Sequence, residues 1–163
     1  MNIKADKEQA RRMMRMALEK AREAAACGEV PVGAVVARGD EVIACAANAR
    51  EHSLDPTAHA EMLALREAAR KLGTRRLSGC TLYVTLEPCP MCAGAIVMAH
   101  PDRLVFGAAD VSAGCTGSVY AITEDPAFGV CIPAYGGVLE EECAQVLKDF
   151  FASRRHTEDL SPF

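Results

Sequence analysis

Apolar residues recur at helical spacing in two long stretches, one near each end of the chain. The first stretch runs from Asp6 to Cys27 before Gly28, and its apolar stripe consists of Met14, Leu18, Ala21 and Ala25. The second runs from Val138 to Arg155 and carries Leu139, Cys143, Val146, Leu147 and Phe150. Spacings of three and four residues place each set on one helical face, so both stretches are predicted to be amphipathic helices.

Short runs rich in branched apolar residues lie between these helices and predict strands. The runs are 30–38, 41–47, 80–86 and 103–108, with a weaker candidate for an edge strand at 130–132. Gly39-Asp40 predicts a tight turn that joins the first two runs into an antiparallel hairpin.

Two further helices are predicted among the strands. Asp55-Pro56 is a typical helix start, and the apolar positions Met62, Leu65, Ala69 and Leu72 continue to Gly73. Pro88 opens the other helix, which continues to Ala99, and 118–123 favours a short helix. The alternation predicts an α/β fold, a three-layer α/β/α sandwich with a single mixed sheet of about five strands, in which helical crossovers make the later strand pairs parallel.

Length and composition indicate one globular domain. The 163 residues are half hydrophobic and one quarter charged, which suits a single domain over 1–163 with a core over about 6–155 and a frayed tail at 156–163. The net charge of −4 argues against general nucleic-acid binding, so any RNA contact needs local basic patches. Candidates for phosphate contacts are Arg70, Lys71, Arg75, Arg76, Arg154 and Arg155.

The eight cysteines are expected to be reduced thiols of a cytoplasmic protein. The first twenty residues are rich in Lys, Arg and Glu and lack the apolar core of an export signal. No apolar run approaches the length that a membrane span needs, so no membrane partner is expected.

The candidate chemistry lies in His59-Ala60-Glu61 and Pro88-Cys89-Pro90-Met91-Cys92. One imidazole and two thiolates can hold a zinc ion through three protein ligands, which leaves the fourth tetrahedral position open as in catalytic zinc sites. A lone C-x-x-C is also typical of a redox pair, and that alternative stays open for the cysteines taken alone. Together, H-x-E followed by P-C-x-x-C is the signature of the zinc-dependent nucleobase deaminases.

The predicted helices place both halves of this motif near helix starts. Cys89 and Cys92, three residues apart, share one helical face, and the amides and dipole of a helix N-terminus favour thiolate. His59 and Glu61 can both reach a ligand that lies ahead of their helix tip. Two helix N-termini are therefore expected to meet at one metal ion.

The chain from about Glu29 to Arg155 resembles the bacterial tRNA-specific adenosine deaminases, which have the cytidine deaminase-like fold. The resemblance is carried by Glu29-Val30-Pro31-Val32-Gly33-Ala34-Val35, Asp55-Pro56-Thr57-Ala58-His59-Ala60-Glu61, Thr81-Leu82-Tyr83-Val84-Thr85-Leu86-Glu87-Pro88-Cys89, Met91-Cys92-Ala93-Gly94-Ala95, Val105-Phe106-Gly107-Ala108 and Leu139-Glu140-Glu141-Glu142-Cys143 leading to Phe150-Phe151.

This resemblance implies a zinc-dependent hydrolase. It implies one Zn²⁺ per subunit held by His59, Cys89 and Cys92, with Glu61 as the proton shuttle. It also implies that a homodimer deaminates the wobble adenosine of a tRNA anticodon to inosine. The residues that correspond to substrate contacts are Asn48, Asp110, Phe151, Arg154 and Arg155.

Three segments depart from the pattern of that family. An aromatic residue or His is common in that family at the position of Ala47, and a basic residue is common at the position of Ala109. An Asn-His-Arg-type segment is common where this chain has Phe128-Gly129-Val130-Cys131. These departures remove possible RNA contacts and leave the metal site intact. A deaminase of a free nucleobase or nucleoside, of the guanine or cytosine type, is therefore the alternative. A zinc-stabilised RNA-binding module without catalysis is disfavoured by Glu61 and by the open coordination position.

Overall fold

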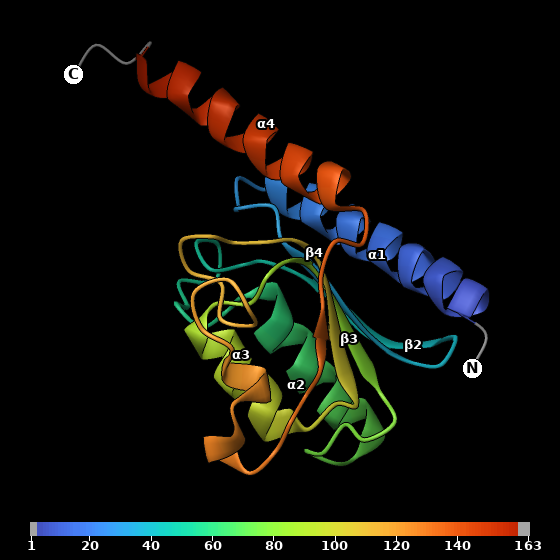
Figure 1. Ribbon diagram of the computed structural model, residues 1–163. Coiled ribbons are helices and arrows are strands. Elements are labelled where there is room, and N and C mark those ends of the chain that lie inside the picture. The colour runs from blue at the N-terminus through green and yellow to red at the C-terminus, as the bar shows by residue number, and fades with distance from the viewer. Residues whose placement is uncertain (1–2, 160–163) are drawn as a thin grey trace.

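A mixed five-stranded sheet separates two pairs of helices in the computed structural model, which describes residues 3–159 (Figure 1). In chain order the elements are α1 (Ile3–Ala26), β1 (Gly33–Arg38), β2 (Glu41–Ala47), α2 (Ala60–Leu72), β3 (Thr81–Leu86), α3 (Pro90–Ala99), β4 (Arg103–Ala108), the 3₁₀ turns η1 (Ile122–Glu124) and η2 (Pro126–Phe128), β5 (Ala134–Tyr135) and α4 (Glu140–Asp159). None of the described helices is long and apolar enough to cross a membrane.

The strand order in the sheet is β2-β1-β3-β4-β5. β1 runs antiparallel to both β2 and β3, while β3–β4 and β4–β5 are parallel. The connection through α2 passes over β1, so β2 and β3 run in the same direction on either side of it. The predicted mixed sheet and the predicted hairpin are confirmed.

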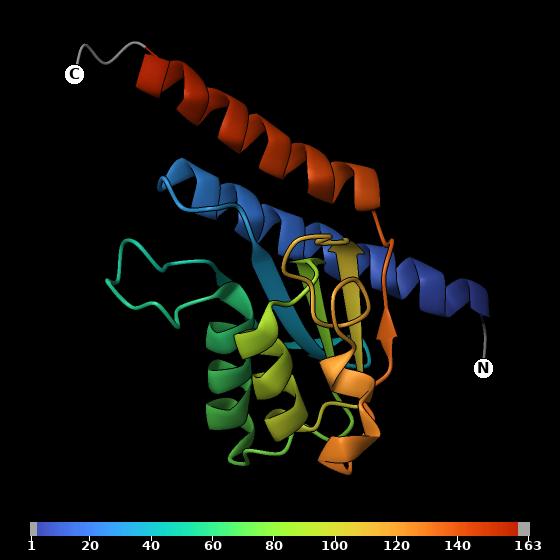
Figure 2. The same cartoon turned by 60° about the vertical axis from the view of Figure 1, so that its left-hand side comes forward.

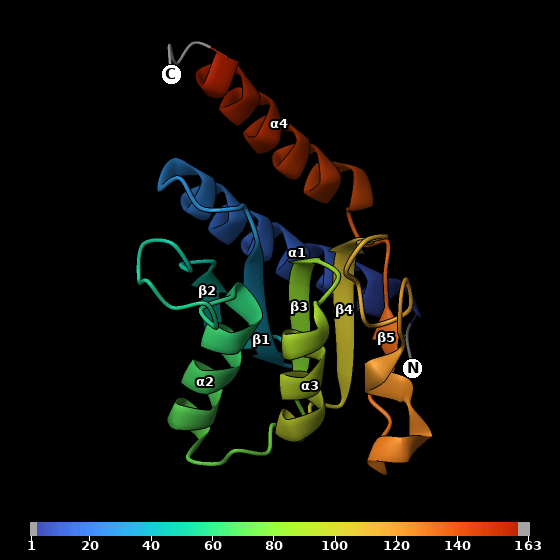
Figure 3. The same cartoon turned by 90° about the vertical axis from the view of Figure 1, so that its left-hand side faces the viewer.

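Helices cover both faces of the sheet, which confirms the predicted sandwich (Figure 2). α1 and α4 lie on one face, where Met14 and Leu18 of α1 pack with Tyr83, Val105 and other buried residues. α2 and α3 lie on the other face, where their buried residues pack on the alternate side chains of the strands. Figure 3 shows α2 and α3 side by side in front of β1 and β3.

The predicted start of the second helix at Asp55-Pro56 is wrong, because α2 begins at Ala60. The Asp55 carboxylate accepts hydrogen bonds from the Thr57 amide at 2.8 Å and the Thr57 hydroxyl at 2.7 Å. The Asp55 side chain therefore closes a local turn and does not cap a helix. His59 becomes the N-cap residue, so it lies at the tip of the helix and not inside it.

The region between β4 and α4 differs from the prediction in two places. The short helix expected over 118–123 is absent, since Thr116 pairs with Ala121 in an isolated bridge and a 3₁₀ turn follows at Ile122–Glu124. The edge strand lies at Ala134–Tyr135 and not at 130–132. Ile132 instead donates its amide to the Thr123 carbonyl, and its side chain is buried.

The last helix is longer than the predicted helix, which ends at Arg155. α4 continues through 156–159, where a frayed tail is expected, and 160–163 lie outside the described residues.

We predict that Gly33→Ala destabilises the fold, because β1 and α1 approach each other at this glycine. An added methyl group would overlap the Ala17 carbonyl oxygen and lie 2.7 Å from the Ala21 nitrogen. Because the groups in contact are backbone atoms that move little, the free energy of unfolding should fall by about 2 kcal/mol or more in chemical denaturation. Gly94→Ala is the matched control, since nothing lies within 4 Å of the added methyl group. Equal stabilities for the two variants would contradict this packing.

Candidate active site

The tips of α2 and α3 meet at one end of the sheet. β2, β3 and β4 run in the same direction, so the segments that leave their carboxyl ends, including the two that lead into α2 and α3, start at the same edge. His59 is the N-cap of α2 and Cys89 is the N-cap of α3, and neither side chain caps its own helix by a hydrogen bond. Pro90 occupies the first turn of α3, where its fixed φ favours a helix start. Both cap side chains are therefore free to face a common ligand.

His59, Cys89 and Cys92 form a cluster with the dimensions of a zinc site. His59 Nδ1 lies 3.6 Å from Cys89 Sγ and 3.5 Å from Cys92 Sγ, and the three potential ligand atoms lie within 4.8 Å of one another. Tetrahedral zinc, with its usual bond lengths to nitrogen and sulfur, holds these two kinds of atom about 3.6 Å apart. The cluster fits one Zn²⁺ through three protein ligands and leaves a fourth position open.

The two thiols of this cluster have opposite proton affinities. The pKa of Cys89 is lowered to about 4, first by the hydrogen bond from Cys92 and also by His59. The pKa of Cys92 is raised by its hydrogen bond to Cys89 and by burial. One thiol thus ionises at the expense of the other, and a divalent cation between them would stabilise both thiolates. This charge pattern suits a metal site and not two independent thiols.

Glu61 lies in the first turn of α2 beside this cluster, and its side chain is only 4% exposed. Burial raises its pKa to about 7. Its Oε2 atom is buried without a hydrogen-bond partner in the described chain. A buried carboxylate oxygen without a partner is costly, so such a group usually has a functional reason. A pKa near neutrality suits a group that both takes up and releases protons.

A cavity of about 230 Å³ opens onto this cluster. It is smaller than the roughly 300–1,000 Å³ typical of drug-sized ligands, so it suits a single base. Its lining includes apolar side chains and the polar residues Asn48, Arg50 and Asp110. The structure thus brings two of the predicted substrate contacts, Asn48 and Asp110, to the same cavity as His59, Glu61 and Cys89.

Asn48 and Asp110 also stabilise their own loops. The Asn48 amide donates to the Val30 carbonyl at 3.1 Å, and its oxygen accepts from the Arg50 amide at 3.4 Å. One oxygen of Asp110 accepts from the amides of Ser112 and Ala113, which closes a turn. Their side chains are therefore held in place at the cavity wall, while their contact with a substrate stays a prediction.

The other predicted substrate contacts, Phe151, Arg154 and Arg155, do not line this cavity. Arg154 stacks over the Phe150 ring at 4.8 Å and donates to the Gly28 carbonyl at 2.9 Å. Phe151 is 46% exposed, and Arg155 is also exposed. These residues lie on the far part of α4, which extends past the sheet (Figure 1). Their contact with a polynucleotide remains a prediction.

The basic residues at the end of α2 lie away from this site. Arg70 and Lys71 are in the last turn of a helix whose first turn holds Glu61, which places them about 15 Å along its axis. Both form ion pairs with Glu67. A phosphate next to a base in the cavity is out of their reach, and their contact with more distant phosphates of an RNA stays a prediction.

Two buried carboxylates, Glu29 and Glu87, support the loops around the cavity and were missed by the sequence analysis. Glu29 accepts hydrogen bonds from the amides of His52 at 2.6 Å and Glu51 at 3.2 Å. Glu87 accepts from the loop that follows β4. Glu87 follows β3 directly and Glu29 lies four residues before β1, but glutamates are mostly exposed, so the sequence carries no signal for this burial.

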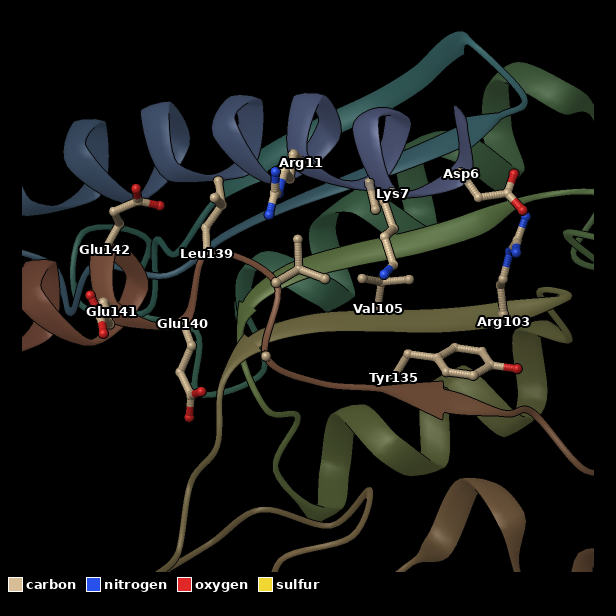
Figure 4. A pocket seen from close by; sticks show the side chains of 13 residues that line it. Asp6, Lys7, Arg11, Arg103, Val105, Tyr135, Leu139, Glu140, Glu141 and Glu142 are labelled. Carbon is tan, nitrogen blue, oxygen red and sulfur yellow. The ribbon is translucent and has the colours of Figure 1, made fainter. Parts of the chain in front are cut away.

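A larger cavity of about 830 Å³ lies on the opposite face of the sheet, between α1, β5 and the start of α4. Figure 4 shows Lys7 and Arg11 of α1 across from Glu140 and Glu141, with Tyr135 below. None of the residues in the His-Cys-Cys cluster lines it. The mixed charges of its lining select no ligand class, so the chemistry of the chain lies at the smaller cavity.

Residues 7–108 match the family described as the cytidine and deoxycytidylate deaminase zinc-binding region. The chain is 48% identical over 142 residues to a tRNA-specific adenosine deaminase of Bacillus subtilis (strain 168). The match covers 87% of this chain and 88% of that protein.

Solved structures of deaminases share this fold. One comes from a study of A-to-I editing by tRNA:A34 deaminases at the wobble position of transfer RNA. It has a TM-score of 0.80 and 42% identity, and the match covers 83% of this chain and 99% of that one. A guanine deaminase from Nitrosomonas europaea has a TM-score of 0.76 and 26% identity, and the match covers 87% of this chain and 84% of that one.

We predict that Cys92→Ser lowers the zinc affinity of the protein by at least about 100-fold. Loss of a residue that only hydrogen-bonds to a metal ligand typically lowers the affinity about 10- to 100-fold, and here a ligand itself is lost. Cys115→Ser is the matched control, since Cys115 is buried outside the cluster and its thiol donates to the Ala113 carbonyl. Competition with a chelator, followed by metal analysis, measures both affinities. The cluster would not be the zinc site if Cys92→Ser bound zinc as tightly as the control.

Proposed function

The chain belongs to the cytidine and deoxycytidylate deaminase family of zinc-dependent hydrolases, and we propose that it converts the wobble adenosine of a tRNA anticodon to inosine. The similarity to the Bacillus subtilis tRNA-specific adenosine deaminase over nearly the whole length of both chains carries this proposal. The His-Cys-Cys cluster next to a buried carboxylate supplies the chemistry that the reaction needs.

Zinc held by His59, Cys89 and Cys92 would supply Lewis-acid chemistry, which lowers the pKa of water toward neutrality. Glu61 takes a proton from the attacking water and delivers it to a ring nitrogen while the water oxygen bonds to the carbon that carries the amine. Glu61 then transfers the second proton of that oxygen to the amino group, and the carbon–nitrogen bond breaks to release ammonia. Adenosine and water thus give inosine and ammonia, and Glu61 returns to its first state.

The size and position of the cavity support a loop nucleotide as the substrate. An adenosine in an anticodon loop is already unpaired, so its extrusion into a pocket costs little. The cavity admits one base, and Asn48, Arg50 and Asp110 surround it with polar groups. An enzyme with few groups that read base edges can select its target in this way, because loop geometry restricts which bases reach the zinc.

A homodimer in the cytoplasm is the expected working form. Val119 and Tyr120 are exposed apolar side chains just before η1. Helix α3 contacts η1 and exposes a third apolar side chain, Met98. Such a surface favours pairing of two chains.

All eight cysteines are free, and reduced thiols are the form that zinc requires.

Deamination of a free nucleobase is the second candidate. The structural similarity to a guanine deaminase favours it, and it would use the same cavity, the same metal cluster and the same carboxylate.

We predict that the zinc-loaded protein releases ammonia from an anticodon stem-loop that carries adenosine at the wobble position, and not from free adenosine, guanine or cytosine. The reason is that loop contacts outside the cavity contribute binding energy that a free base lacks. A stem-loop with guanosine at that position is the matched control. Turnover of a free base without turnover of the stem-loop would favour the second candidate.

We also predict that Glu61→Gln keeps one zinc per chain but lowers turnover by at least about 100-fold, because the amide cannot carry a proton between water and the base. Glu67→Gln is the matched control on the same helix, where the carboxylate forms ion pairs with Arg70 and Lys71. Steady-state kinetics and metal analysis of both variants test this. Near-normal turnover in zinc-loaded Glu61→Gln would exclude the role proposed for Glu61.

A further inference from the structure

The loop over 110–118, which follows β4, folds around the carboxylate of Glu87. Glu87 Oε2 accepts the Asp110 amide at 3.0 Å and a short hydrogen bond from the Ser118 hydroxyl. Its Oε1 accepts the amides of Ser118 at 2.9 Å and Thr116 at 3.2 Å. The side chain is only 2% exposed, so one buried acceptor collects backbone donors from both ends of the loop.

The middle of the same loop also packs directly on this carboxylate. An added methyl group at Gly114 would overlap the Glu87 carboxyl group and would lie 2.5 Å from the Asp110 carbonyl oxygen. The Gly114 amide donates to that same carbonyl at 2.8 Å. A side chain at position 114 would therefore push the loop away from Glu87.

Hydrogen bonds to Glu87 hold this loop, in which Cys115 is the only buried apolar side chain of the described residues. None of its residues belongs to either hydrophobic core cluster of the described chain. The hydrogen bond from the Thr116 amide is buried, and those from Asp110 and Ser118 are partly buried. A buried amide that loses a charged acceptor is left unsatisfied, which costs more than an ordinary hydrogen bond contributes. Loss of the Glu87 carboxylate would therefore release the loop while both core clusters stay intact.

The loop forms one wall of the candidate active site. Asp110 and Ala113 both line the cavity that holds Glu61, and Glu87 itself reaches its edge. Asp110 is one of the residues predicted to contact the substrate, so its position depends on where Glu87 holds the loop.

We propose that Glu87 is a positioning residue that fixes the 110–118 loop at the cavity wall and so sets the affinity for the target nucleotide. This inference rests on the proposed deaminase function. In this proposal Glu87 affects the affinity for the substrate, whereas other residues bind the metal and transfer protons.

The test compares Glu87→Gln and Gly114→Ala with the control Glu67→Gln. The first variant removes the charge and replaces one of the two acceptor oxygens by an NH2 donor, and the second displaces the loop from the opposite side. Both should raise KM for the anticodon stem-loop about tenfold or more, since small displacements of substrate-positioning groups have such effects. The kcat should change less than about threefold, and one zinc per chain should remain. A fall in kcat or zinc content with unchanged KM would overturn the proposal.

A double-variant cycle tests whether Glu87 acts through the loop. If it does, Glu87→Gln combined with Asp110→Asn should raise KM no more than the larger single effect, because both remove the same contact. Multiplied effects on KM would show independent roles and overturn the proposal.

Amide hydrogen exchange tests the loop without any substrate. Exchange at Asp110, Thr116 and Ser118 should accelerate at least about tenfold in Glu87→Gln while the strands stay protected. Unchanged exchange would overturn the proposal for Glu87 but not the deaminase function. Wild-type protein that turns over a free base and not the stem-loop would contradict the tRNA substrate, and the KM comparison then uses that base.

Discussion

The approach of two helix tips is the constraint on which this structure depends. The imidazole at the start of α2 lies 3.5–3.6 Å from two sulfurs at the start of α3, and each of those separations matches a shared tetrahedral zinc ion. The dipoles of both helices favour negative charge at this point, which offsets part of the cost of burying thiolates and a carboxylate together. A cation bound there would stabilise both thiolates and remove the opposition between their proton affinities.

Strand direction explains why residues far apart in sequence meet there. β1 is antiparallel to both of its neighbours, so β2 and β3 end at the same edge of the sheet, and β4 ends there as well. The segments that carry Asn48, His59, Cys89 and Asp110 all leave from this edge. Two buried carboxylates, Glu29 and Glu87, then hold the loops that close the cavity. The fold thus supplies one rigid edge for the metal and hydrogen-bonded loops for the substrate.

The sequence predicted the architecture and the metal cluster because both depend on local signals. Apolar periodicity located the main helices and strands, and the spacing of His59, Cys89 and Cys92 identified the ligands that the structure brings together. The start of α2 was misplaced because an Asx turn at Asp55 and a true helix cap use the same residues. The edge strand was misplaced by a few residues and the scaffolding carboxylates were missed, because both depend on tertiary hydrogen bonds that no local pattern reports.

X-ray absorption at the zinc edge of the purified, zinc-loaded wild-type protein tests the shared metal site most directly. The structure predicts two sulfur neighbours at about 2.3 Å, one imidazole nitrogen at about 2.0–2.1 Å and one further light atom. A shell of four sulfurs, or a shell without sulfur, would contradict a metal held between the tips of α2 and α3.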